Sequence, residues 1–217
     1  MNQLKQILND GIFYAISKFI PGLVGVLFIL IFTRILGLND YGTYSLYIAQ
    51  FNLLVSFAFG WLNQSELRYG NKVNNDENKT KILNFFLSFL ILLVMIYIFH
   101  FKQNNFPNYV LITFFCTCSI GLFSYFRTIF QSKINPKAFL RLTLIQSTLY
   151  ISIPLIIASF FSLNDSLLLI CSGFSFLIPS FVLIFYNRDL FKFKIENYKI
   201  LKKWFYFGAP ISMWASI

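Results

Sequence analysis

Lys18 is the residue whose chemistry stands out, because it is a cation inside an apolar run. It lies about 10 Å from the start of that run, at 1.5 Å per helical residue. A cation at such a depth costs at least about 2.5 kcal/mol unless water or an anion meets it. No carboxylate is obviously available to pair with it. Lys18 therefore either faces a hydrated cavity and an anionic ligand, or extends its stem to the membrane surface.

Two apolar runs also carry amide and hydroxyl groups. Gln50 and Asn52 belong to one run, and Gln146, with Ser147 and Thr148 beside it, belongs to another. Such groups usually join helices by hydrogen bonds, and in some bundles they line a polar passage instead. We select Gln50 and Gln146 as candidates for contact with a sugar.

The pattern does not indicate catalysis, a metal site or a cofactor. Acid–base or metal chemistry needs carboxylates or histidines that converge in a pocket. All eight acids fall at expected helix ends or in loops, and the lone histidine, His100, closes the third run. The three cysteines lie inside apolar runs without converging ligands. We predict a protein that is not an enzyme.

The elements that hold these residues are predicted to be membrane-spanning helices. The sequence is 57% hydrophobic and only 12% charged, and a bilayer crossing needs about 20 mostly apolar residues. Six runs qualify, and they are residues 12–32, 42–62, 82–101, 109–130, 142–161 and 166–186. The fold class predicted is an all-α polytopic integral membrane protein. Residues 1–203 would form a six-helix N-terminal lobe, and residues 204–217 would begin a seventh helix.

The loops predict the orientation. With the N-terminus in the cytoplasm, fifteen Lys and Arg residues fall on the inner side, while only Arg34 and Lys102 fall on the outer side. The inner residues are Lys5, Arg68, Lys72, Lys79, Lys81, Arg127, Lys133, Lys137, Arg141, Arg188, Lys192, Lys194, Lys199, Lys202 and Lys203. This asymmetry predicts a multi-pass protein of the bacterial inner membrane with a cytoplasmic N-terminus.

The same distribution argues against a nucleic-acid partner despite the net charge of +10. A nucleic-acid binder gathers Lys and Arg on one folded face, whereas here they occur in short loops between apolar runs. The basic segment 187–203 is either an amphipathic helix on the inner leaflet, in contact with membrane lipids, or a plain charged linker.

A short polar turn with a distinctive pattern joins the first two runs. Residues 32–37 read Phe-Thr-Arg-Ile-Leu-Gly, and Tyr41, Gly42 and Tyr44 follow. Arg34 would anchor the outer end of the first helix among headgroups, and Gly37 would let that helix stop. Asn39 or Asp40 could cap the next helix. We expect these residues to be structural rather than to contact a substrate.

This turn resembles the end of the first span in bacterial polysaccharide flippases. The end of the fourth span in those proteins is resembled by residues 123–131, Phe-Ser-Tyr-Phe-Arg-Thr-Ile-Phe-Gln. The opening of their seventh span is resembled by residues 207–210, Phe-Gly-Ala-Pro. The chain thus resembles the N-terminal half of the polysaccharide transporter, or O-antigen-type lipid-linked oligosaccharide flippase, family within the multidrug/oligosaccharidyl-lipid/polysaccharide exporter superfamily.

The resemblance implies a two-lobed bundle whose central cavity opens alternately to each side of the membrane. It implies flipping of undecaprenyl-pyrophosphate-linked sugar units for O-antigen, lipopolysaccharide, capsule or a related polysaccharide. Cations in the cavity would meet the pyrophosphate, and Lys18 stands where a related lipid-precursor flippase subfamily also carries a cation. The expected partners are the lipid-linked oligosaccharide, a second half-chain or copy, and a polysaccharide polymerase.

Three alternatives stay open at this point. One is a drug or cation antiporter of the same superfamily, whose coupling would favour an intramembrane carboxylate. The second is a membrane enzyme such as a sugar-chain polymerase, which would have large outer loops. The third is a non-transporting truncated product, since the chain resembles one lobe and could be a fragment, a frameshifted gene or a split one.

Overall fold

A computed structural model shows six α-helices. It describes residues 2–70, 78–101, 108–133, 135–186, 204–208 and 210. The helices are α1 (Asn2–Leu36), α2 (Leu38–Tyr69), α3 (Asn78–Phe101), α4 (Asn108–Ser132), α5 (Pro136–Phe160) and α6 (Asp165–Tyr186). One helix lies at each of the six expected ranges, and no strand occurs in the described part of the chain.

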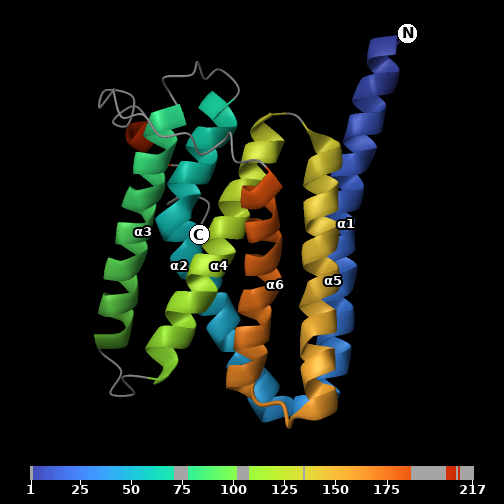
Figure 1. The fold of residues 1–217 in the computed structure, drawn as a ribbon, viewed down its shortest axis with the longest axis vertical. Helices are drawn as coiled ribbons and strands as arrows, with labels where there is room; N and C mark the ends of the chain where they lie inside the picture. The colour runs from blue at the N-terminus through green and yellow to red at the C-terminus, as the bar shows by residue number, and fades with distance from the viewer. Residues whose placement is uncertain are drawn as a thin grey trace.

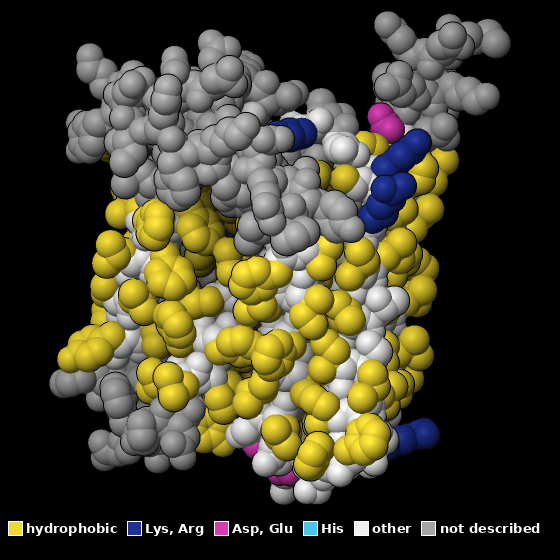
Figure 2. Space-filling model, in the orientation of Figure 1, with side chains coloured by type: hydrophobic (Ala, Val, Ile, Leu, Met, Phe, Trp, Pro, Cys, Tyr) yellow, Lys and Arg dark blue, Asp and Glu magenta, His cyan; other side chains and the backbone are white. Residues whose placement is uncertain are grey.

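In the part of the chain that the structure describes, five helices are long and apolar enough to cross a membrane. Large apolar side chains such as Phe19, Leu30, Leu90 and Phe160 are exposed. In Figure 2, hydrophobic side chains cover the face between the two ends of the bundle, and the visible charged side chains lie towards those ends. The chain is an all-α polytopic membrane protein, as predicted.

α4 lies at the centre of the bundle and contacts four other helices, α2, α3, α5 and α6. α1 packs on α5 and on α2, and α6 packs on α4, α5 and α2. Figure 1 shows the start of α1 at the same end of the bundle as the α4–α5 turn; we call this the N-terminal end. The α1–α2 and α5–α6 turns lie at the other end, which we call the hairpin end.

Two glycines allow α4 to pack closely with its neighbours. A Cβ on Gly121 of α4 would lie 2.6 Å from the Phe59 ring of α2. A Cβ on Gly173 of α6 would collide with the Phe115 ring and approach the Cys116 sulfur at 3.3 Å. Small residues are common at helix contacts in membranes because packing there replaces the hydrophobic effect as the driving force.

The helix boundaries have local causes. Gly37 separates α1 from α2 with φ 83° and ψ 168°, a backbone region essentially restricted to glycine. α2 begins at once, with Gly37 as its N-cap and no side-chain cap, so the expectation that Asn39 or Asp40 caps it was wrong. Asn135 does cap α5, where its side chain accepts a hydrogen bond from the Ala138 amide at 3.2 Å.

Residues 204–208 are helical and pack against α2. The Ser65 hydroxyl donates to the Trp204 carbonyl at 2.7 Å, and the Arg68 guanidinium lies 4.2 Å from the centre of the Phe207 ring. A Cβ on Gly208 would collide with the Trp61 carbonyl oxygen, so the two backbones touch. The predicted linker 187–203 lies outside the described residues, and the division into two lobes stays a prediction.

Candidate functional site: a cavity with a buried arginine

A cavity of about 350 Å³ lies inside the bundle, where five helices meet. Its lining comes from α1 (Pro21, Val24, Gly25), α2 (Asn52, Val55, Ser56), α4 (Ile120, Phe123, Ser124, Arg127), α5 (Gln146, Ser147, Tyr150) and α6 (Phe176). No lining residue is acidic. A concave site with an apolar wall and a few converging polar groups is the usual form of a small-ligand site.

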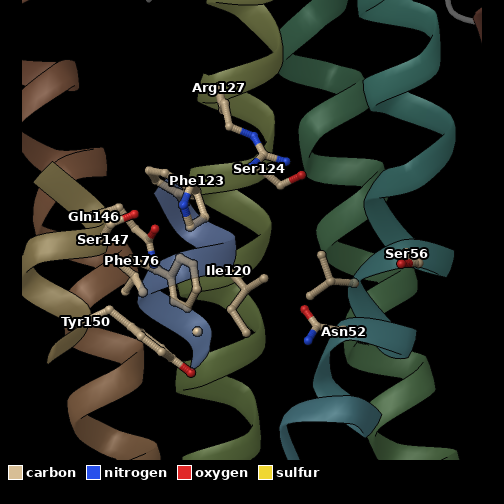
Figure 3. A pocket seen from close by; sticks show the side chains of 14 residues that line it. Asn52, Ser56, Ile120, Phe123, Ser124, Arg127, Gln146, Ser147, Tyr150 and Phe176 are labelled. Atoms are coloured by element: carbon tan, nitrogen blue, oxygen red, sulfur yellow. The ribbon is translucent and has the colours of Figure 1, made fainter. Parts of the chain in front are cut away.

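Arg127 lies towards the N-terminal end of this cavity (Figure 3). Its side chain is half-buried, and its guanidinium carbon is 5.9 Å from the centre of the Phe139 ring. Among the described residues no hydrogen bond or salt bridge joins it to another side chain. A partly desolvated guanidinium without a counter-charge attracts an anion, and its planar donors suit a phosphate especially well.

Lys18 places a second positive charge near Arg127. It lies on α1, three residues before the cavity-lining Pro21, and therefore on the same helix face. Its side chain is exposed rather than part of the lining, and the charges of Lys18 and Arg127 are close enough to act on each other. Two cations that repel each other are both stabilised when one anion binds between them.

Aromatic contacts hold this cationic end in place. The Tyr14 ring of α1 lies 5.4 Å from the Phe139 ring of α5, which is the ring that Arg127 faces. Ser17 is buried and donates to the Tyr14 carbonyl at 2.7 Å. α1, α4 and α5 are therefore joined where the two cations lie.

The structure places the two candidate glutamines differently. Gln146 lines the cavity and is 8% exposed. Gln50 is outside the lining, and its buried Oε1 accepts no hydrogen bond from a described residue. Asn52, two residues further along α2, lines the cavity instead. Residues two apart point to different helix faces, which explains why only one of this pair reaches the cavity.

A hydrogen-bonded group of hydroxyls lies at the side of the cavity nearer the hairpin end. The Tyr150 hydroxyl, whose ring lines the cavity, is 2.6 Å from the Tyr44 hydroxyl, which is also 2.9 Å from Ser172 Oγ. The Phe28 ring packs on both tyrosine rings, with centroids 4.4 Å from Tyr150 and 5.7 Å from Tyr44. The hydroxyl network joins α2, α5 and α6, and the Phe28 ring packs α1 against it.

The residues of the α1–α2 turn do not line the cavity. Arg34 is exposed in the last turn of α1, and Gly42 has open space around it. The Tyr41 ring is half-buried, 5.7 Å from the Tyr44 ring. Together with the unusual backbone at Gly37, these positions are compatible with the structural role that we expect for the turn.

Sequence reasoning missed two charged residues inside the bundle. It counted Arg127 among the cytoplasmic charges, although its spacing of three and seven residues from Ser124 and Ile120 on one helix face signalled a shared surface. It also treated Glu66 as an ordinary helix-end acid. Glu66 is in the last turn of α2 but wholly buried, and its Oε1 accepts a hydrogen bond from Ser132 at 3.3 Å. It lies outside the cavity lining.

Comparison with known protein families shows to which family this chain belongs. A family model described as "Polysaccharide biosynthesis protein" matches residues 7–214, nearly the whole chain. The chain belongs to the polysaccharide biosynthesis protein family. Searches of curated proteins and of solved structures found no match. Membership supports a transport role related to polysaccharides, in agreement with the resemblance seen in the sequence.

Proposed function

We propose that this member of the polysaccharide biosynthesis protein family translocates undecaprenyl-pyrophosphate-linked oligosaccharide units across the bacterial inner membrane. The observation that carries the proposal is Arg127, whose guanidinium lines a cavity between five helices that has no acidic residue in its lining. A pyrophosphate that leaves water must exchange its hydration for fixed positive partners. Arg127, with Lys18 beside it, supplies such partners.

The orientation in this proposal is the one that the loop charges predict. With the N-terminus in the cytoplasm, the N-terminal end of the bundle faces the side where the lipid-linked substrate is made. Arg127 and Lys18 then lie where a pyrophosphate would enter, and the Tyr44–Tyr150 network lies between the cavity and the outer side. We further propose that a second half-chain or copy supplies the other lobe needed for alternating access.

Binding of undecaprenyl pyrophosphate tests the anion site directly. Purified protein in nanodiscs is titrated with undecaprenyl pyrophosphate and, separately, with uncharged undecaprenol, and the dissociation constants are measured by native mass spectrometry. Charge-assisted hydrogen bonds contribute about 1.5–3 kcal/mol, so Arg127→Ala should weaken binding of the pyrophosphate roughly 10- to 100-fold. Arg141→Ala is the matched control, because Arg141 is exposed on α5 and does not line the cavity.

Lys18 has its own test in cells that make the polysaccharide. Lys18→Ala should reduce surface polysaccharide without lowering the amount of protein, and Lys18→Arg should largely preserve it. Equal binding of the pyrophosphate and undecaprenol, with no effect of Arg127→Ala, would refute the proposed substrate. Normal polysaccharide in Lys18→Ala would remove Lys18 from the site.

A further inference from the structure

Beyond the cations, the cavity has a wall of neutral polar groups whose hydrogen-bonding capacity is unused. Ser147 Oγ is buried and has no hydrogen-bond partner in the part of the chain that the structure describes. Gln146 is more than nine-tenths buried and forms no hydrogen bond with any described residue. Buried polar groups are normally satisfied, so an unpartnered amide and hydroxyl side by side in a cavity indicate a ligand that supplies the missing bonds.

Three aromatic rings form the apolar part of the same wall. The Phe176 ring is 5.6 Å from the Phe123 ring and 6.0 Å from the Tyr150 ring, centre to centre. Figure 3 shows these rings beside Gln146 and Ser147, with Asn52 across the cavity on α2. A sugar ring has the matching chemistry, because its hydroxyls meet amides and hydroxyls while its C–H face packs on aromatic rings.

The arrangement of charge narrows the class of sugar. The polar lining residues other than Arg127 are amides, serines and a tyrosine, none of which is charged at neutral pH. A carboxylate placed among them would be desolvated without a cation to compensate. Gln146 and Tyr150 are one helical turn apart, which is about 6 Å and comparable to the length of one pyranose ring.

We propose that Gln146, Ser147 and Tyr150, with Asn52 opposite, form a subsite for one uncharged sugar, the unit attached directly to the pyrophosphate. The inference rests on the proposed function, since Arg127 is taken to hold the phosphate next to that sugar. Arg127 would then provide affinity for every lipid pyrophosphate, while the neutral wall would distinguish among the sugars that the lipid carries.

The test compares three lipids on the purified 217-residue chain in nanodiscs: undecaprenyl pyrophosphate alone, the same lipid with a single neutral hexose, and the same lipid with a single hexuronic acid. The neutral hexose should tighten binding about tenfold relative to the sugarless lipid, the effect of one or two net hydrogen bonds. The hexuronic acid should give no such gain.

Two variants test whether the neutral polar residues of the cavity wall produce the tighter binding of the hexose-bearing lipid. Gln146→Leu and Ser147→Ala should each remove most of the gain from the hexose, measured within each variant as the ratio of the dissociation constants of the sugarless and the hexose-bearing lipid. Ser147→Ala removes a hydroxyl that forms no hydrogen bond with a described residue, so it should not lower the unfolding temperature. Thr148→Ala is the control, because the Thr148 hydroxyl is exposed on the same helix and bonds to its own helix at 2.9 Å.

The outcomes separate this inference from the proposed function. If the sugarless and hexose-bearing lipids bind equally and Arg127→Ala weakens both, the proposed function stands and the sugar subsite is refuted. If the hexuronic acid binds more tightly than the hexose, the charge argument is wrong. If none of the three lipids binds, both proposals fail. A gain from the hexose that survives both wall variants would place the sugar elsewhere.

Discussion

The hydroxyl network at the hairpin side of the cavity makes a quantitative prediction about stability. Tyr44 has two hydroxyl neighbours, Tyr150 at 2.6 Å and Ser172 at 2.9 Å. A net hydrogen bond contributes about 0.5–1.5 kcal/mol in proteins, and about 0.6 kcal/mol on average between membrane helices. Replacing Tyr44 with Phe keeps the ring and removes both bonds, so the free energy of unfolding should fall by about 1–2 kcal/mol.

Tyr150→Phe should lower the free energy of unfolding by less than Tyr44→Phe does, about 0.5–1 kcal/mol, because Tyr44 keeps its hydrogen bond to Ser172. Ser172 in turn donates to the Leu168 carbonyl at 2.9 Å, so its hydroxyl stays satisfied when Tyr44 is changed. In the Tyr44→Phe variant the Tyr150 hydroxyl has already lost the Tyr44 hydroxyl as its partner. Removing the Tyr150 hydroxyl as well should therefore lower the free energy of unfolding very little further. The double variant should therefore be about as stable as Tyr44→Phe alone, with a coupling of about 0.5–1 kcal/mol.

The assay is unfolding in mixed micelles by titration with sodium dodecyl sulfate, followed by circular dichroism, on all four members of the cycle. Tyr14→Phe is the control, because its hydroxyl makes no hydrogen bond with a described residue while its ring packs on Phe139. Additive losses in the double variant, or a larger loss for Tyr150→Phe than for Tyr44→Phe, would show that the two hydroxyls do not form the network described.

Substitutions at three further positions, two of them with a matched control, test the packing and the turns by the same unfolding measurement. Gly121→Ala should lower the free energy of unfolding by about 1–3 kcal/mol, because the new Cβ would lie 2.6 Å from the Phe59 ring. Gly22 has open space around it, so Gly22→Ala should be neutral or stabilising. Equal effects of the two substitutions would contradict the close contact at Gly121. Gly37→Ala should cost about 1–3 kcal/mol because the new side chain is strained at φ 83°, and a neutral result would mean that the turn relaxes. Asn135→Ala should cost about 1 kcal/mol by removing the cap of α5, and Asn135→Asp should preserve stability; similar losses in both would exclude capping as the reason.

The helices were predictable because each is encoded by a continuous apolar run. A bilayer leaves a backbone segment little choice but to satisfy its own hydrogen bonds, so length and hydropathy are enough to place a helix. The prolines did not interrupt this pattern, since α1, α5 and α6 continue through Pro21, Pro154 and Pro179. The cap of α2 was not predictable by the same means, because Gly37 both ends one helix and begins the next.

The cavity was predictable only in part. Lys18 stood out because an apolar run makes a cation conspicuous, and Gln146 because an amide in such a run needs a partner. Arg127 lies near a helix end, where loop charges are expected, so its sequence position alone indicated topology rather than a site. Gln50 was selected over Asn52 although only Asn52 lines the cavity, because the face of α2 that turns inward depends on how the helices pack.

The α1–α2 turn, which carries one part of the family resemblance, is separate in space from the cavity, whereas the segment 123–131, which carries another part, contributes Phe123, Ser124 and Arg127 to the cavity lining. The α1–α2 turn is recognisable because a tight hairpin between two spanning helices requires particular residues at adjacent positions, with Gly37 as the clearest case. The cavity collects residues from five helices, and each helix contributes only one to four. Outside the segment 123–131, a site assembled in this way leaves no compact motif, so polar groups that form no hydrogen bond with a described residue, such as Ser147 Oγ, help to mark it. The same reasoning suggests that family members that carry different glycans should differ at positions such as Gln146 and Ser147 while they retain the turn.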